Sequence, residues 1–184
     1  HDMGCADGNA AADGNTAPLS LRDTTPSAMP AYTPQSISHH MDTHLAHVML
    51  GTRAYDVHDP RRIALYLLNN ILGGSSMSSR LYLSLREKYG LVYNIDSQAV
   101  PLSDTGYWDI YLACEPQHKD QCLELCHKEL QTLREVRLTS AQLQRALRQL
   151  EGQLAISAEN QENNALAMAK QMLYHHRAPQ WQET

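Results

Sequence analysis

The run of residues 72–93, LGGSSMSSRLYLSLREKYGLVY, constrains the fold of this chain more than any other segment. It begins with two adjacent glycines, which adopt backbone angles that other residues resist. Leu81 and Leu85 are spaced i, i+4, so the pattern predicts a short amphipathic helix. Gly90 then follows a turn that carries lysine, which is typical of a left-handed helix stop, and the β-forming residues after it predict a strand over 91–100. The helix can be capped by one of three serines, namely Ser75, Ser76 or Ser78.

Arg86 and Tyr93 lie on either side of this predicted helix stop. Arg86 is one turn before the end of the helix, and Tyr93 is three residues after Gly90, so the two side chains can meet on one surface. A guanidinium and a phenol are both donors suited to a developing negative charge on oxygen. The structural alternative is a surface ion pair for the arginine and a core position for the tyrosine. Tyr82, one turn before Arg86, either orients the guanidinium or packs in the core.

Hydrophobic patterning predicts an α+β fold for the rest of the chain. Residue patterning favours strands at 44–50, 91–100 and 107–114, and in the last of these Trp108, Ile110, Leu112 and Cys114 fall on one face. Helical periodicity favours a helix at 117–136. Thr139 and Gln142 have the spacing of a capping box, which predicts a long helix continuing through Leu154. Adjacent strands with short loops, and helices before and after them, predict an antiparallel-rich sheet with helices packed on one face.

Composition fits one globular domain with an extension at its amino end. Residues 1–34 are rich in Ala, Gly, Asn, Asp, Thr and Pro, so we expect a flexible linker or a vector-derived remnant there and a folded domain over 35–184. The net charge of −5 argues against nucleic-acid binding, and no apolar run approaches the roughly 18 residues that a membrane span requires. The four cysteines suggest no disulfide framework, which favours a reducing compartment such as the cytoplasm, with the periplasm as the alternative.

The run 72–93 resembles the signature Leu-Gly-Gly-x-x-Met-x-Ser-Arg-Leu followed by Leu-Arg-Glu-Lys-x-Gly-Leu-x-Tyr of the pitrilysin, insulinase and mitochondrial processing peptidase family of inverzincin zinc peptidases. The resemblance is to the non-catalytic C-terminal-type domain of that family and extends over about 44–176. Residues 43–51 look like the family's entry strand, and residues 61–72, after Asp59 and Pro60, look like the helix that leads into the loop. The resemblance implies a processing-peptidase-like metallohydrolase half, truncated at its carboxyl end.

The resemblance also implies roles for four residues. In this family the arginine and tyrosine matching Arg86 and Tyr93 hold the substrate backbone and assist the oxyanion on the partner domain. Gly73 and Gly74 match a glycine-rich loop near the peptide path, while turn geometry is their structural alternative. The loop lacks the lysine and the spacing of a phosphate-binding loop.

The zinc motif of the family, His-x-x-Glu-His on a helix, does not occur in this sequence. The densest histidine group has no glutamate within it and leads into a predicted strand; it consists of His39, His40, His44 and His47. Cys122 and Cys126 lie one helical turn apart, and with the adjacent His127 they could be read as a metal site, but packing of the two thiols as small hydrophobes is the better interpretation. We therefore expect no metal on this chain and a zinc ion on a partner catalytic domain.

These observations predict the substrate-binding, zinc-free half of a zinc metalloendopeptidase. Such a half would clamp an extended peptide against a catalytic domain, fused or on a separate chain, within a homodimer or heterodimer, and would be inactive alone. The alternative is a catalytically dead scaffold or peptide-binding partner of the same fold. The sequence leaves open whether the whole protein is an active enzyme.

Overall fold

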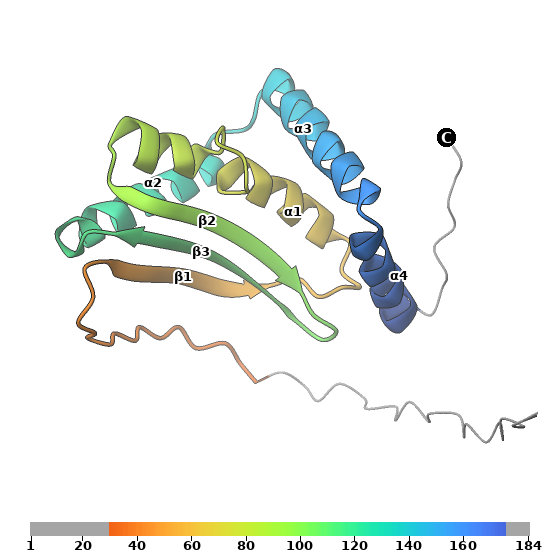
Figure 1. Cartoon of the computed structure of the whole chain (residues 1–184), viewed down its shortest axis with the longest axis horizontal. Helices are drawn as coiled ribbons and strands as arrows, with labels where there is room; N and C mark the ends of the chain where they lie inside the picture. The colour runs from red at the N-terminus through yellow and green to blue at the C-terminus, as the bar shows by residue number, and fades with distance from the viewer. Residues whose placement is uncertain (1–29, 176–184) are drawn as a thin grey trace, which may run out of the picture.

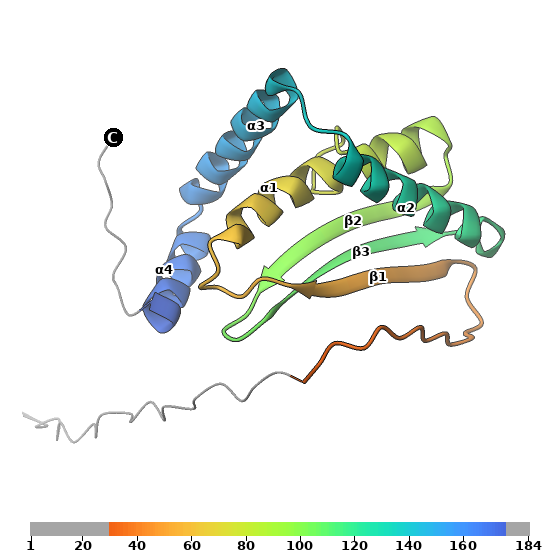
Figure 2. The same ribbon diagram turned by 180° about the vertical axis from the view of Figure 1, so that it is seen from behind.

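The structure, a computed structural model, describes residues 30–175 and contains one antiparallel sheet with helices on one of its faces (Figure 1). The sheet has three strands in the order β1-β3-β2, namely β1 (Ala46–Ala54), β2 (Val92–Pro101) and β3 (Gly106–Cys114). Viewed from behind, α1 and α2 again lie above the strands (Figure 2). The predicted α+β class is confirmed, and each predicted strand is present with ends shifted by up to four residues.

Four α-helices accompany the sheet. Helix α1 (Arg61–Leu72) connects β1 to the glycine loop and packs on β2, whereas α2 (Lys119–Glu135) follows β3 after a 3₁₀ turn at Pro116–His118. Helix α3 (Ser140–Glu159) packs on α1, and α4 (Gln161–His175) contacts α3 at the far end of the layer (Figure 1). None of these helices is long and apolar enough to cross a membrane.

The predicted capping box at the start of α3 is confirmed. The backbone N–H of Gln142 donates to Thr139 Oγ1 at 3.3 Å, and the backbone N–H of Thr139 donates to Gln142 Oε1 at 2.9 Å. Each partner thus satisfies a group that the first helical turn would otherwise leave without a hydrogen bond.

The core lies between the sheet and the helices. The apolar face of β3 points into it: Ile110, Leu112 and Cys114 are fully buried, and Trp108 packs against them. Burying one such aliphatic side chain stabilises the fold by about 1.5–3 kcal/mol. The other members of the buried cluster come from α1, the short helix after the glycine loop, β2 and α2; they are Leu72, Leu81, Leu85, Val92, Cys122 and Cys126.

Cys122 and Cys126 occupy this core as small hydrophobic groups, as the amphipathic pattern predicted. Both side chains are fully buried, and burial raises the pKa of each thiol to about 12. The thiols are therefore protonated at neutral pH. Since zinc binds thiolates, this environment disfavours metal binding by the pair.

The short helix predicted after the glycine loop is present, and it is a π-helix, η1 (Tyr82–Lys88). None of the three serines caps it, because Leu81 occupies the capping position and its side chain cannot accept a hydrogen bond. Ser76 Oγ instead accepts from the backbone N–H of Ser78, before the helix begins. The predicted stop is confirmed: Gly90 has φ of +62°, and its N–H donates to the carbonyl of Arg86 at 3.0 Å.

Replacing Gly90 with alanine is expected to destabilise the fold by about 1 kcal/mol, because an L-residue resists this left-handed conformation. Gly152 is the matched control, since it lies inside α3 with no atom near the position of an added Cβ. Gly152→Ala should stabilise the fold by about 0.5–1 kcal/mol. Urea unfolding of both variants measures this, and equal effects of the two substitutions would contradict the assigned stop.

Candidate functional site

The glycine loop is packed directly against β2. The carbonyl of Gly73 accepts a 2.9 Å hydrogen bond from the backbone N–H of Ser97, and the N–H groups of Gly73 and Gly74 both donate to the carbonyl of Asn69. A Cβ added at Gly73 would lie 2.7 Å from Ser97 Cβ, and one at Gly74 would lie 2.6 Å from Asn70 Oδ1. Close packing thus requires glycine at both positions, and a role in substrate binding stays a prediction.

A buried polar network below this loop was not predicted from the sequence. Asn69 Oδ1 accepts hydrogen bonds from Ser97 Oγ at 2.5 Å and from Trp108 Nε1 at 2.8 Å, while Asn69 Nδ2 donates to the carbonyl of Ser97 at 2.9 Å. One residue on α1 thereby holds β2 and β3 through its side chain and the glycine loop through its backbone carbonyl. The available signal was a polar pair, Asn69 and Asn70, in a helix that is apolar between its first two arginines and this pair.

Arg86 lies on η1 with its side chain exposed to solvent. Its guanidinium carbon is 5.2 Å from the centroid of the Tyr82 ring, and Tyr82 is half-buried. The structure therefore favours contact with Arg86, rather than a core position, for this tyrosine. No ion pair joins Arg86 to a carboxylate within residues 30–175, so its donors are available for another acceptor.

Tyr93 lies at the start of β2, at a β-bulge between Val92 and Asn94. Val92 faces the core, whereas Tyr93 is 59% exposed, which excludes the core position considered for it. Bulges re-aim side chains and are common beside functional sites. η1 and β2 contact each other, so the structure places Arg86 and Tyr93 on adjacent elements, both exposed, without a hydrogen bond between them in the described part of the chain.

The histidine group does not form a metal centre in the structure. His39, His40 and His44 lie in the segment before β1 and are exposed, whereas His47, on β1, has its Nδ1 hydrogen-bonded to Tyr111 Oη at 2.7 Å. Across residues 30–175, no group of three or more His, Cys, Asp or Glu side chains could hold a metal ion.

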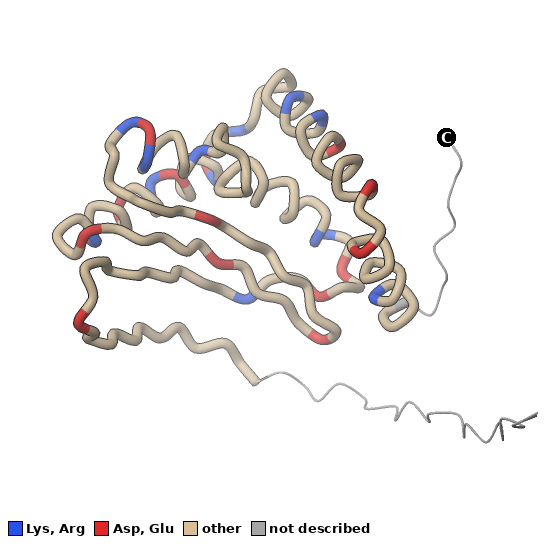
Figure 3. The backbone as a smooth tube through the Cα atoms, viewed as in Figure 1, with Lys and Arg blue, Asp and Glu red and all other residues tan. Residues whose placement is uncertain are grey.

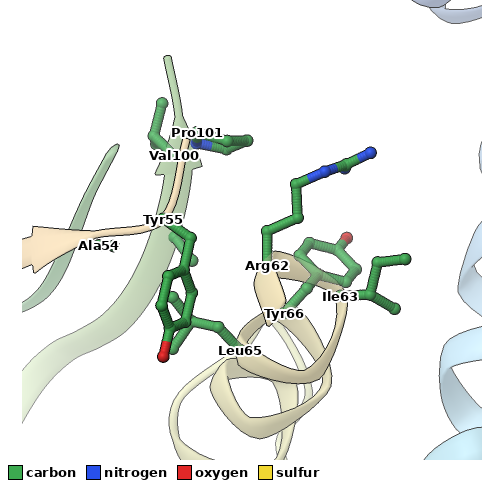
Figure 4. A pocket seen from close by; sticks show the side chains of 9 residues that line it. Ala54, Tyr55, Arg62, Ile63, Leu65, Tyr66, Val100 and Pro101 are labelled. Carbon is green, nitrogen blue, oxygen red and sulfur yellow. The ribbon is translucent and has the colours of Figure 1, made fainter. Parts of the chain in front are cut away.

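A small apolar pocket opens between the first turns of α1 and the ends of β1 and β2 (Figure 4). The rings of Tyr55 and Tyr66 lie on two sides of it, and Arg62 extends above. None of the four predicted site residues lines this pocket.

Comparison with known proteins gives a consistent assignment. The family model for the peptidase M16 inactive domain matches residues 14–150. An uncharacterized zinc protease of Streptomyces coelicolor is 38% identical over 118 residues, which cover 64% of this chain and 26% of that protein. An uncharacterized zinc protease of Bacillus subtilis is 34% identical over 131 residues, which cover 71% of this chain and 32% of that protein. The chain thus spans between a quarter and a third of the length of these relatives.

Solved structures share the fold. The peptidase M16 inactive domain from Pseudomonas fluorescens superposes with a TM-score of 0.64 at 26% identity, over 73% of this chain and 32% of that chain. An inactive peptidase domain from Bordetella parapertussis gives a TM-score of 0.60 at 17% identity, over 76% of this chain and 75% of that chain. Because the family match covers most of the sequence and the fold agrees with it, this chain belongs to the peptidase M16 family of zinc proteases as its inactive domain.

Proposed function

We propose that this domain is the substrate-binding, zinc-free half of a zinc metalloendopeptidase and clamps an extended peptide against a catalytic domain. The observation that carries the proposal is the exposure of Arg86 and Tyr93 on two adjacent elements. An arginine without an ion pair and a tyrosine outside the core have donors free for a ligand. The family membership supplies the context in which such donors would face a peptide.

The chemistry assigned to the pair is electrostatic. Hydrolysis of a peptide bond passes through a tetrahedral intermediate with a negatively charged oxygen, and preorganised donors stabilise that charge more than they stabilise the substrate. The Arg86 guanidinium is held over the Tyr82 ring, which restricts the conformations of a long side chain. The Tyr93 phenol is held at the bulge of a paired strand, so both donors are mounted on ordered backbone.

Zinc would be supplied by the partner domain, where it would activate the attacking water. The described residues of this chain do not fit a zinc ion, because His47 is bonded to Tyr111 and the buried thiols of Cys122 and Cys126 are protonated at neutral pH. No step of the reaction is therefore assigned to a metal on this chain.

The test compares the 184-residue chain alone with the chain mixed with the catalytic domain of the same protease. We expect no stoichiometric zinc and no peptide cleavage from the chain alone, and chelator-sensitive cleavage of a fluorogenic peptide after mixing, above that of the catalytic domain by itself. Metal analysis and the fluorescence assay measure both. Chelator-sensitive cleavage by the chain alone would overturn the proposal, and no gain on mixing would favour the scaffold alternative.

A further inference from the structure

The face of the sheet opposite the helices carries a hollow with a carboxylate at its floor. Figure 1 shows that α1 and α2 cover only one face of the strands. On the other face, the hollow is lined mainly by residues of β1 and β3, with one residue from β2 and one from the segment before β1; they are Tyr32, Met49, Gly51, Thr52, Arg53, Gln98, Tyr107, Trp108 and Asp109.

The strand register creates this hollow. Asp109, on the central strand, lies directly between Gly51 of β1 and Gln98 of β2. Because Gly51 has no side chain, the position beside the carboxylate is open on that flank. A Cβ added at Gly51 would be 3.7 Å from Asp109 Cβ, an ordinary contact distance, so the space is not required by backbone packing.

Asp109 is unusual for a carboxylate in such a position. Its side chain is only 4% exposed, and no Lys, Arg or His forms an ion pair with it in the described part of the chain. Burial raises the pKa of Asp109, nearby Asp96 raises it further, and a hydrogen bond with Gln98 opposes the shift. Buried carboxylates are usually paired with a cation, so this one lacks its normal partner.

The surroundings of the hollow are suited to a cation. Tyr107 and Tyr32 line it and are 43% and 49% exposed, which leaves their rings accessible. Tyrosine rings attract cations placed over their faces. Arg53, the cation among the lining residues, has its guanidinium carbon 5.7 Å from the centroid of the Tyr32 ring, and within residues 30–175 no ion pair joins it to Asp109. Figure 3 shows the same arrangement along the strands, with acidic residues on β2 and β3 and a basic residue on β1.

We propose that this hollow binds the basic side chain of an extended peptide, with Asp109 pairing to its guanidinium and Tyr107 contacting the charged group from the side. The hollow lies about 16 Å along β2 from Tyr93, because Gln98 is five residues further and a strand rises about 3.3 Å per residue. A peptide held at Arg86 and Tyr93 could thus place a side chain several residues away in the hollow. The inference deepens the proposed function and rests on it for the identity of the ligand as a peptide.

The experiment titrates the 184-residue chain with the peptide Ac-Ala-Ala-Arg-Ala-Ala-NH₂ and follows the amide signals of Gly51 and Gly106 by NMR. The same peptide with citrulline in place of arginine is the ligand control, because it has nearly the same shape without the charge. We expect the arginine peptide to shift the Gly51 signal and to bind at least about tenfold more tightly than the citrulline peptide, as charge-assisted hydrogen bonds allow.

Four variants locate the effect. Asp109→Asn should lower the affinity for the arginine peptide about tenfold or more. Asp96→Asn, which removes an equal charge from the neighbouring strand, should change that affinity less than about threefold. Gly51→Val should block binding by filling the hollow with Asp109 unchanged. Arg53→Gln should strengthen binding, because it removes a competing positive charge from the rim.

Thermal unfolding separates binding from folding in these variants. Asp109→Asn should be at least as stable as the parent at pH 7, since it removes a desolvated charge and an amide can still bond to Gln98. Equal binding of the two peptides, or an equal loss of affinity in Asp109→Asn and Asp96→Asn, would overturn the proposed binding role of the hollow. Neither result would affect the roles proposed for Arg86 and Tyr93. Those roles are tested by turnover of the assembled protease, so the two failures are distinguishable.

Discussion

Arg86→Ala is expected to lower kcat/KM of the assembled protease by about 10²-fold to 10³-fold, the usual effect of removing one donor to an oxyanion. The domain itself should keep its stability, because the side chain is exposed and forms no ion pair in the described structure. Tyr93→Phe removes only the phenolic hydroxyl of a 59% exposed side chain and should also reduce turnover with no loss of folding. Initial rates on a fluorogenic peptide, with urea unfolding of each variant, measure the two effects separately.

Lys88→Ala is the matched control for Arg86→Ala. Lys88 belongs to the same π-helix and is exposed. Its ammonium is 4.9 Å from the centroid of the Tyr89 ring, which parallels the contact between Arg86 and the Tyr82 ring. Tyr89→Phe is the corresponding control for Tyr93, since Tyr89 is 43% exposed. Both controls should retain turnover within about twofold. Unchanged turnover in Arg86→Ala and Tyr93→Phe would contradict the proposed role of these residues in stabilising the oxyanion.

Asn69→Leu is expected to destabilise the domain by about 3–5 kcal/mol. The substitution keeps the volume but leaves Ser97 Oγ, Trp108 Nε1 and the carbonyl of Ser97 without the bonds that Asn69 provides. Each buried polar group left unsatisfied costs about 1–3 kcal/mol. Since domains of this size are stable by about 5–15 kcal/mol, the variant should be largely unfolded at moderate urea concentrations. The midpoint of urea unfolding, followed by circular dichroism, measures the change.

Two variants show whether the network, rather than burial alone, causes this loss. Asn70→Ala alters the neighbouring residue, which is also buried at 8% exposure and for which no side-chain hydrogen bond is seen within residues 30–175. It should cost less than about 1 kcal/mol. Ser97→Ala removes one bond and leaves Asn69 bonded to Trp108, so an intermediate loss of about 1 kcal/mol is expected. Similar losses for Asn69→Leu and Asn70→Ala would contradict the role of the network.

Local sequence determined the elements whose stabilising contacts lie within one or two helical turns. Leu81 and Leu85 fall four residues apart and are both fully buried, and the capping box of Thr139 and Gln142 forms as its spacing predicts. Gly90 ends its helix because only glycine adopts φ of +62° without strain. These features depend on backbone geometry and on side chains close in sequence, so a reader of the sequence can predict them.

The candidate site was predicted only in part. The sequence placed Arg86 and Tyr93 on either side of one helix stop, but their exposure depended on η1 and on the bulge at the start of β2. The sequence did not specify the π-helical geometry, because residues spaced i, i+4, such as Leu81 and Leu85, lie on the same side of both an α-helix and a π-helix. The glycine loop was recognised, whereas its tight packing on Ser97 required the position of β2.

By itself, then, the sequence determined the order of the three strands and of the helices as far as Leu154, and the family to which they belong. Only the tertiary structure joined Asn69 to Ser97 and Trp108, which are 28 and 39 positions away, and brought Gly51 and Gln98 to either side of Asp109. The physical reason is that pairing between distant strands depends on the whole register of the sheet. A shift of one residue would turn Asp109 to the opposite face, and no local pattern around a single residue specifies that register.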